Sequence, residues 1–183
     1  MDSESSYRCF LDGDDEGLVR LIEEFKEPLT LYLCSITGNV FAAEELMEET
    51  FFRLASKKPR FSGRSSFKTW LYAIARNLAV DRLRREAKRP TAPLDEALAS
   101  AELSSVEEEY LKSEEKIAVH RALARINNEY RQALWLSYFE ELSNGEIARV
   151  TGKSKRQVEN LLYRAKHSLR IELEKEGIGD EKH

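Results

Sequence analysis

The sequence predicts an all-α fold, organised as two small helical domains joined by a flexible linker. Only eight Gly and four Pro occur in 183 residues, which leaves strands and tight turns scarce. Apolar residues recur three and four positions apart along several stretches, as they do on the buried face of a helix. With 42% hydrophobic and 34% charged residues, the chain can form one ordinary domain or two small ones. We expect a first domain over residues 1–89, a linker over 90–113 and a second domain over 114–183.

The first segment, from Asp12 to Ala55, predicts two or three helices. Pro28 is expected to interrupt the first apolar stripe, and Thr37-Gly38-Asn39 to supply the turn before the second. The stripe before this turn consists of Leu18, Leu21, Ile22, Phe25, Leu29 and Tyr32, and the stripe after it of Ala42, Leu46, Phe51 and Leu54.

Four carboxylates form an acidic ladder in this segment, at Glu44, Glu45, Glu48 and Glu49. Glu45 and Glu49 lie one helical turn apart, a spacing that also occurs in di-iron helical bundles. Such bundles need Glu-x-x-His pairs on several helices, and the sequence has none. Two interpretations remain for the ladder, a solvated acidic face and a docking surface for a basic partner.

The stretch from Phe61 to Arg89 predicts an amphipathic helix with a basic outer surface. Such a helix can pack one face in a core and present the other to nucleic acid. Its apolar residues at helical spacing are Phe67, Leu71, Ile74 and Leu78. Its cations fall largely elsewhere, at Lys68, Arg76, Arg82, Arg84, Arg85, Lys88 and Arg89.

Charge is unevenly distributed along the chain. Residues 1–52 hold 3 Lys/Arg against 13 Asp/Glu, whereas residues 53–89 hold 12 against 2. Residues 91–151 are acidic again, with 6 against 12, and residues 152–170 return to basic with 6 against 1. The overall net charge of −4 therefore conceals two basic segments, which predict two contacts with nucleic acid.

The second domain carries the pattern of a helix-turn-helix. Residues 143–146 and 154–157 each read Ser-x-x-Glu or Ser-x-x-Gln, the capping box that marks a helix start. Between these starts, Ala148 is small where two helices would cross, and Gly152 stands where the turn needs a left-handed residue. Val158 can pack the second helix onto the first.

The helix after this turn combines an apolar stripe with polar residues near its N-terminal end. A recognition helix that enters the major groove requires this combination. The alternative is an ordinary amphipathic helical hairpin. The polar residues are Lys155, Arg156, Glu159, Asn160, Tyr163, Arg164 and Lys166, and the apolar ones are Val158, Leu161, Leu162 and Leu169.

Three blocks of the sequence, in the family's order, resemble bacterial RNA polymerase sigma factors. AEELMEETFFRLA resembles their core-polymerase-binding motif, and FSGRSSFKTWLYAIARNLAVDRLRR resembles their promoter-melting region. EELSNGEIARVTGKSKRQVENLLYRAKHSLR is similar to sigma region 4, which reads the −35 promoter element. The resemblance covers roughly Asp12 to Arg170. With no room for the family's extra N-terminal and middle regions, the chain resembles its compact extracytoplasmic-function (ECF) group.

The resemblance implies three sets of site residues. Binding to core polymerase falls on Glu45, Glu48, Glu49 and Phe52. Recognition and melting of the −10 element falls on Phe61, Arg64, Lys68, Trp70, Tyr72, Arg76, Asn77, Asp81 and Arg84, with Arg82 and Arg85 as further phosphate contacts. Recognition of the −35 element falls on Lys153, Ser154, Lys155, Arg156, Glu159, Asn160, Tyr163, Arg164 and Lys166.

Some positions depart from the family pattern or allow a second interpretation. The family more often has Gln at the position of Glu48, and many relatives have Arg at the positions of Glu159 and Leu161. The preferred −35 sequence therefore does not follow from the resemblance. Trp70 and Tyr72 each allow two interpretations, a core aromatic and a DNA contact.

The resemblance implies a sigma factor that has no catalytic chemistry and no cofactor of its own. Its expected partners are core RNA polymerase, promoter DNA as duplex and as single strand, and an anti-sigma factor. A stand-alone helix-turn-helix regulator is the alternative, and it would leave the Phe61–Arg89 block unexplained.

Metal and membrane functions are not predicted. The thiols of Cys9 and Cys34 are not in a metal-ligand spacing and are expected to be reduced, and His120, His167 and His183 share no ligand spacing. No apolar run approaches the roughly 20 residues of a membrane span, and the N-terminus is acidic, unlike a secretory signal. We expect a cytoplasmic protein.

Overall fold

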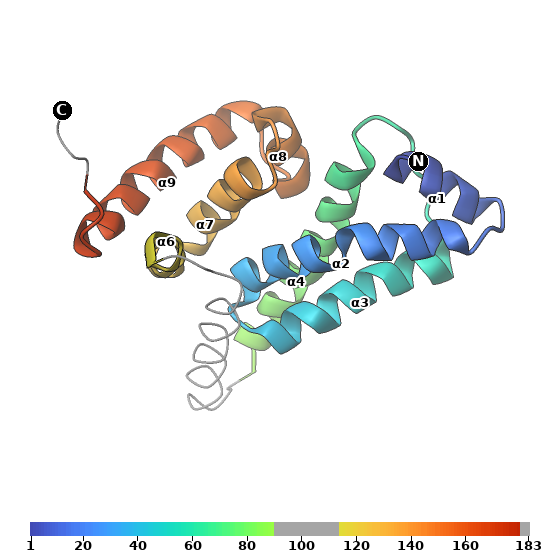
Figure 1. Cartoon of the computed structure of the whole chain (residues 1–183), viewed down its shortest axis with the longest axis horizontal. Helices are drawn as coiled ribbons and strands as arrows, with labels where there is room; N and C mark the ends of the chain where they lie inside the picture. Colours follow the sequence, from blue (N-terminus) through green and yellow to red (C-terminus); the bar gives the residue numbers. More distant parts are fainter. Residues whose placement is uncertain (90–113, 180–183) are drawn as a thin grey trace.

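The computed structural model describes residues 1–89 and 114–179, and every regular element within these ranges is a helix (Figure 1). The expected linker, residues 90–113, lies outside the described residues. The first group of helices consists of α1 (Ser3–Leu11), α2 (Glu16–Thr37), α3 (Val40–Lys57) and α4 (Phe67–Ala87). The second consists of α6 (Glu114–Arg125), α7 (Asn128–Leu134), the π-helical turn η1 (Trp135–Phe139), α8 (Asn144–Thr151) and α9 (Lys155–Lys175).

Helix α2 continues through Pro28, so the expected interruption of this helix was wrong. A proline inside a helix costs about 3 kcal/mol, because it removes a hydrogen bond and its ring crowds the preceding turn. The flanking side chains of Phe25 and Leu29 are buried, and burial of such a side chain stabilises by about 1.5–3 kcal/mol. Burial of the α2 side chains before and after Pro28 therefore offsets the free-energy cost of the proline.

The core of the first group lies between α2, α3 and α4. Its largest fully buried side chains include Tyr32, Leu33, Leu46, Leu54 and Leu71. The apolar stripes of the sequence supply these residues, as expected, except for Leu33, which the stripes did not include. Helix α1 was not predicted, although it buries Tyr7 and Phe10 against the same core.

The second group closes around α7, α8 and α9. Ile147, Val158 and Ala165 are completely buried where the helix-turn-helix packs on the rest of the group. Both predicted capping boxes are present, at Ser143 with Glu146 and at Ser154 with Gln157.

The two groups are packed against each other, a contact that the sequence did not predict. In Figure 1, α7 and α8 lie beside α2 and α4. Asn128 Nδ2 donates to Ile36 O at 2.8 Å, and Arg131 Nε donates to Ser35 O at 2.7 Å. Both acceptors lie in the last turn of α2, where carbonyl groups have no partner within the helix. The second group thus caps the C-terminal end of α2.

Candidate nucleic-acid and polymerase interfaces

The acidic ladder lies on an outer face of α3. Glu45 and Glu48 are exposed, Glu49 is about half exposed, and the Phe52 side chain beside them is 69% exposed. An exposed phenylalanine next to several carboxylates is typical of a binding surface, because exposing an apolar ring to water is unfavourable unless a partner covers it. The structure therefore brings all four residues expected to bind polymerase onto one surface.

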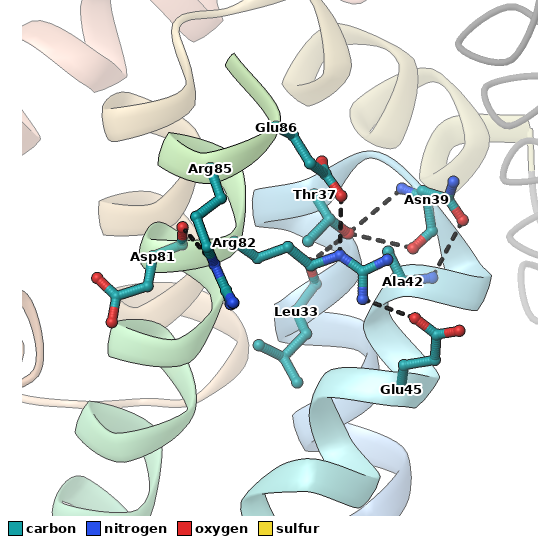
Figure 2. Close-up of polar contacts among 9 residues, drawn as sticks. All are labelled: Leu33, Thr37, Asn39, Ala42, Glu45, Asp81, Arg82, Arg85 and Glu86. Atoms are coloured by element: carbon teal, nitrogen blue, oxygen red, sulfur yellow. Dashed lines mark hydrogen bonds and ion pairs between the residues drawn. The ribbon is translucent and has the colours of Figure 1, made fainter. Parts of the chain in front are cut away.

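Glu45 also has a role within the fold. Figure 2 shows the guanidinium of Arg82 between Glu45 of α3 and Glu86 of α4. Arg82 Nη1 lies 2.7 Å from Glu45 Oε2, and Arg82 Nε lies 2.9 Å from Glu86 Oε1. This network joins α3 to α4, so Arg82 is occupied by carboxylates in this structure.

The segment between α3 and α4 (residues 58–66) has no regular secondary structure, and we term it the melting loop after the role that the sequence resemblance implies. Its Phe61 is half-buried, with its ring centroid 5.2 Å from that of Trp70 and 5.8 Å from that of Phe67. Trp70 belongs to the same aromatic cluster and is half-buried. Part of its ring therefore packs in the core, and part is accessible to a partner. The side chain of Arg64 is exposed.

The cations of α4 divide into two sets. Arg84, Arg85 and the neighbouring polar residues Asn77 and Asp81 are exposed. In contrast, Lys68 contacts the second helical group.

Lys68 Nζ lies 2.9 Å from Glu140 Oε2, which belongs to the residues directly after η1. Arg76 Nε donates to Gln132 Oε1 at 3.0 Å. In this arrangement both cations therefore have protein partners at the positions where DNA phosphates were expected.

Tyr72 is fully buried, so in this arrangement it is a core aromatic and is not accessible to DNA. Its ring packs against that of Tyr32, with centroids 5.3 Å apart, and Lys68 Nζ lies over it. Burial raises the pKa of Tyr72, and the nearby Glu140 carboxylate adds to the shift. The position was assigned from the family pattern, which does not distinguish the buried side of α4 from its outer side.

The helix-turn-helix has the geometry that its sequence predicts. Gly152 has φ 69° at the end of α8, a left-handed conformation that costs glycine little. The Ser154 side chain accepts from Gln157 N and begins α9. Lys153 lies 3.0 Å from a carboxylate oxygen of Glu129, so this residue too has a protein partner here.

The expected base-contacting side chains project from α9 into solvent. Tyr163 is 79% exposed, and the ammonium of Lys166 lies 5.7 Å from the Tyr138 ring centroid. An uncovered helix face of this composition fits a major groove. The exposed polar residues of this face are Lys155, Arg156, Glu159, Asn160, Tyr163, Arg164 and Lys166.

Sequence reasoning missed α1 and the contacts between the two groups. Tyr7, Phe10 and Leu11 have helical spacing after a capping Asp2, a signal that could have revealed α1. No comparable signal marks Glu140, since a glutamate at the end of a helix is ordinarily solvated.

Residues 1–89 and 114–179 contain neither a metal-binding cluster nor a membrane-spanning helix. No group of three or more His, Cys, Asp or Glu side chains there could hold a metal ion. Within the same ranges, no helix is both long enough and apolar enough to span a membrane.

Comparison with known proteins agrees with this geometry. The family model described as sigma-70 region 2 matches residues 21–89, and that described as sigma-70 region 4 matches residues 116–169. The chain is 27% identical to the ECF RNA polymerase sigma factor SigW of Bacillus subtilis, over 88% of this chain and 91% of SigW. It is 31% identical to the ECF sigma factor BldN of Streptomyces coelicolor, over 86% of this chain and 60% of BldN.

A solved structure shares the fold. The sigma factor RpoE of Bartonella quintana, in complex with the anti-sigma factor NepR, superposes with a TM-score of 0.66 and 18% identity, over 85% of this chain and 95% of RpoE. The region 2 and region 4 matches fall on the two helical groups, with the helix-turn-helix in the second. The chain belongs to the bacterial RNA polymerase sigma factors, and within them to the ECF group. It binds core RNA polymerase and directs transcription initiation at promoters, and this family is not a class of enzymes.

Proposed function

We propose that Glu45, Glu48, Glu49 and Phe52 form the surface that docks on core polymerase. Their shared exposure on α3 supports this assignment, since complementary charge on a polymerase helix would then speed association and fix the register. Glu48→Lys is the sharpest test, because Glu48 makes no ion pair within residues 1–89 and 114–179, whereas Glu45 also joins α3 to α4. We expect about tenfold weaker binding to core polymerase, measured by fluorescence anisotropy.

The matched control for this surface is Glu23→Lys, which reverses an exposed charge on α2. Both variants should melt within a few degrees of the unmodified protein when followed by circular dichroism. Equal affinities of the two variants for core polymerase would remove α3 as the docking surface.

The melting loop and the outer face of α4 are proposed to bind the −10 element. Phe61 and Trp70 offer aromatic surface for an unstacked base, and Asn77 and Arg84 are exposed further along α4. Lys68 and Arg76 would join this surface only after the two helical groups separate, because both now contact the second group. Opening of the chain is therefore part of the proposed function.

Asn77→Ala tests the −10 assignment. It should reduce open-complex formation on duplex promoters much more than on templates with a pre-opened bubble, since the bubble already carries the cost of unstacking. Permanganate footprinting measures both. An equal loss on the two templates would indicate a defect in folding or in general DNA binding.

The exposed face of α9 is proposed to read the −35 element. Arg156, Glu159 and Asn160 lie near its N-terminal end, where side chains of a recognition helix reach base edges. Glu159→Ala should cost about 1–3 kcal/mol on the cognate element and little on scrambled DNA, whereas Lys166→Ala should weaken all sequences alike. Holoenzyme binding across a salt series distinguishes these outcomes, and a uniform loss for Glu159→Ala would remove it as a reader.

The remaining proposals concern regulation and organisation. RpoE was solved in complex with an anti-sigma factor, and CnrH with the cytosolic domain of CnrY. By analogy, we propose that an anti-sigma factor controls this chain, which acts in the cytoplasm and supplies no catalytic group to transcription. Residues 1–89 and 114–183 would be its two functional units, connected by the linker over 90–113.

One observation supports the proposal most strongly. The exposed face of α9 carries side chains that can hydrogen-bond to DNA bases, and it follows a domain that matches sigma-70 region 2 in the same chain. Run-off transcription with purified core polymerase on genomic fragments is the direct test. A stand-alone regulator would instead bind duplex DNA tightly without polymerase and produce no transcript.

A further inference from the structure

Helix α1 contacts the melting loop through the fully buried side chain of Tyr7. The hydroxyl of Tyr7 donates to Pro59 O at 2.5 Å, across 52 positions of sequence. The ring of Tyr7 lies 5.3 Å from that of Phe67 and 5.4 Å from that of Trp70. These two aromatics are the ones that hold Phe61 at the centre of the loop. Tyr7 thus contacts both the backbone of the loop and its aromatic support.

The position of α1 is fixed by a close approach to α2. A Cβ atom placed on Gly17 would lie 2.2 Å from Ser6 O and 2.7 Å from Phe10 N. Only glycine permits this distance between the two helices. Phe10 is buried there, and the ammonium of Lys58, the first residue of the loop, lies 4.8 Å from its ring centroid. Helix α1 therefore offers a rigid support to the start of the loop.

Within the described residues, two side chains from outside the loop donate hydrogen bonds to its backbone carbonyls, one from each helical group. Tyr7 holds Pro59 O, and Arg149 Nη1 of α8 donates to Arg64 O at 2.7 Å. Separation of the two groups would remove the bond from Arg149. The bond from Tyr7 would remain, because α1 and the loop belong to the same group. In the opened chain, α1 is what continues to shape the loop.

We propose that α1 positions the melting loop for capture of an unpaired DNA strand, with Tyr7 as the positioning residue. This inference rests on the proposed role of the loop in promoter melting. It adds an element to that role, because the region 2 family model begins at residue 21, after α1 has ended. The loop presents Phe61 and Arg64 in a fixed geometry, so less of the binding energy is lost in ordering them on DNA.

Tyr7→Phe tests the inference, because it keeps the ring and removes only the hydroxyl. The matched control is Ser3→Ala on the same helix, whose hydroxyl bonds to Glu24 and does not contact the loop. The first measurement is the rate of tryptic cleavage after Arg60 and Arg64 in the full chain. Loss of one hydrogen bond should speed this cleavage about two- to tenfold, and Ser3→Ala should leave it unchanged.

The second measurement compares open-complex formation on duplex and pre-opened promoters by holoenzyme. Tyr7→Phe should lower the ratio of duplex to bubble activity several-fold, with unchanged affinity for core polymerase and an intact circular dichroism spectrum. An unchanged cleavage rate, or an unchanged ratio, would overturn the inference. Phe61→Ala separates its failure from that of the proposed function. If Phe61→Ala lowers the ratio while Tyr7→Phe does not, the loop melts DNA without help from α1. If neither lowers it, the loop has no role in melting.

Discussion

The ion pair between Lys68 and Glu140 joins the two helical groups where removal of one charge should have a measurable effect. Lys68 Nζ lies 2.9 Å from Glu140 Oε2 and 3.0 Å from Glu140 O. The Glu140 side chain is only 6% exposed, and the Lys68 side chain is 34% exposed. Glu140→Gln keeps the shape of the side chain and removes its charge. The Lys68 ammonium would then have no carboxylate partner in an interface that is partly shielded from water.

The magnitude follows from the exposure of the pair. Breaking a fully buried ion pair costs about 3–5 kcal/mol, whereas an exposed pair contributes about 0–1 kcal/mol. Lys68 can turn toward water because one third of its side chain is exposed, so we expect an intermediate loss of about 1–2 kcal/mol. That loss corresponds to a shift of about five- to thirtyfold from the closed toward the opened chain.

Small-angle X-ray scattering of the full chain measures this shift as a larger radius of gyration. The matched control is Glu141→Gln, the adjacent and exposed glutamate. Free Glu140→Gln protein should also bind single-stranded −10 DNA more tightly than the control does, since Lys68 becomes available to phosphates. If Glu140→Gln and Glu141→Gln gave the same scattering and the same DNA affinity, the ion pair would not hold the groups together.

Three further changes have expected outcomes in thermal unfolding experiments. Gly152→Ala should destabilise by about 1–2 kcal/mol, because alanine is strained at φ 69°, whereas Gly145→Ala within α8 should be neutral or stabilising. Pro28→Ala should stabilise the protein by about 1–2 kcal/mol, because it restores a backbone hydrogen bond of α2. This value allows for the greater conformational entropy that alanine gives the unfolded chain, and a loss of stability would contradict the expectation. Burial lowers the pKa of His120 below 6.5, so the unfolded chain binds that proton more readily. The free energy of unfolding should therefore decrease as the pH falls from above 6.5 toward the folded pKa of His120. The His120→Phe variant should show a smaller decrease over this range, which thermal melts from pH 8 to pH 5 would measure.

Local patterns predicted much of the fold, because caps and apolar stripes depend on residues a few positions apart. The capping boxes of α8 and α9 and the left-handed Gly152 are of this kind. The continuation of α2 through Pro28 was not predictable, since it depends on packing against helices that are distant in sequence. The same reason explains Glu140, which is buried where the second helical group packs against the first and pairs with Lys68 of α4.

The candidate site was predicted by residue type and position along the chain, but not by accessibility. Spacing places Lys68, Arg76 and Tyr72 on α4 together with Asn77 and Arg84, and sequence alone treats all five alike. The structure separates them, because the first three face the second helical group or the core, and the last two face solvent. Which side of a basic helix is free depends on tertiary packing that the pattern does not contain.

Under the role proposed for α4, Lys68 and Arg76 cannot hold the chain closed and bind the −10 element at the same time. The Glu140 carboxylate occupies the anion position at Lys68, and Gln132 occupies the hydrogen-bonding position at Arg76. Any partner that binds only the opened chain must therefore supply the free energy of opening, and it then makes these cations available to DNA. Core polymerase is such a partner if it holds the two helical groups apart, and a ligand that binds only the closed chain would have the opposite effect. The same interface thus allows polymerase to favour promoter binding and an inhibitor to oppose it, without either one contacting Lys68 or Arg76 directly.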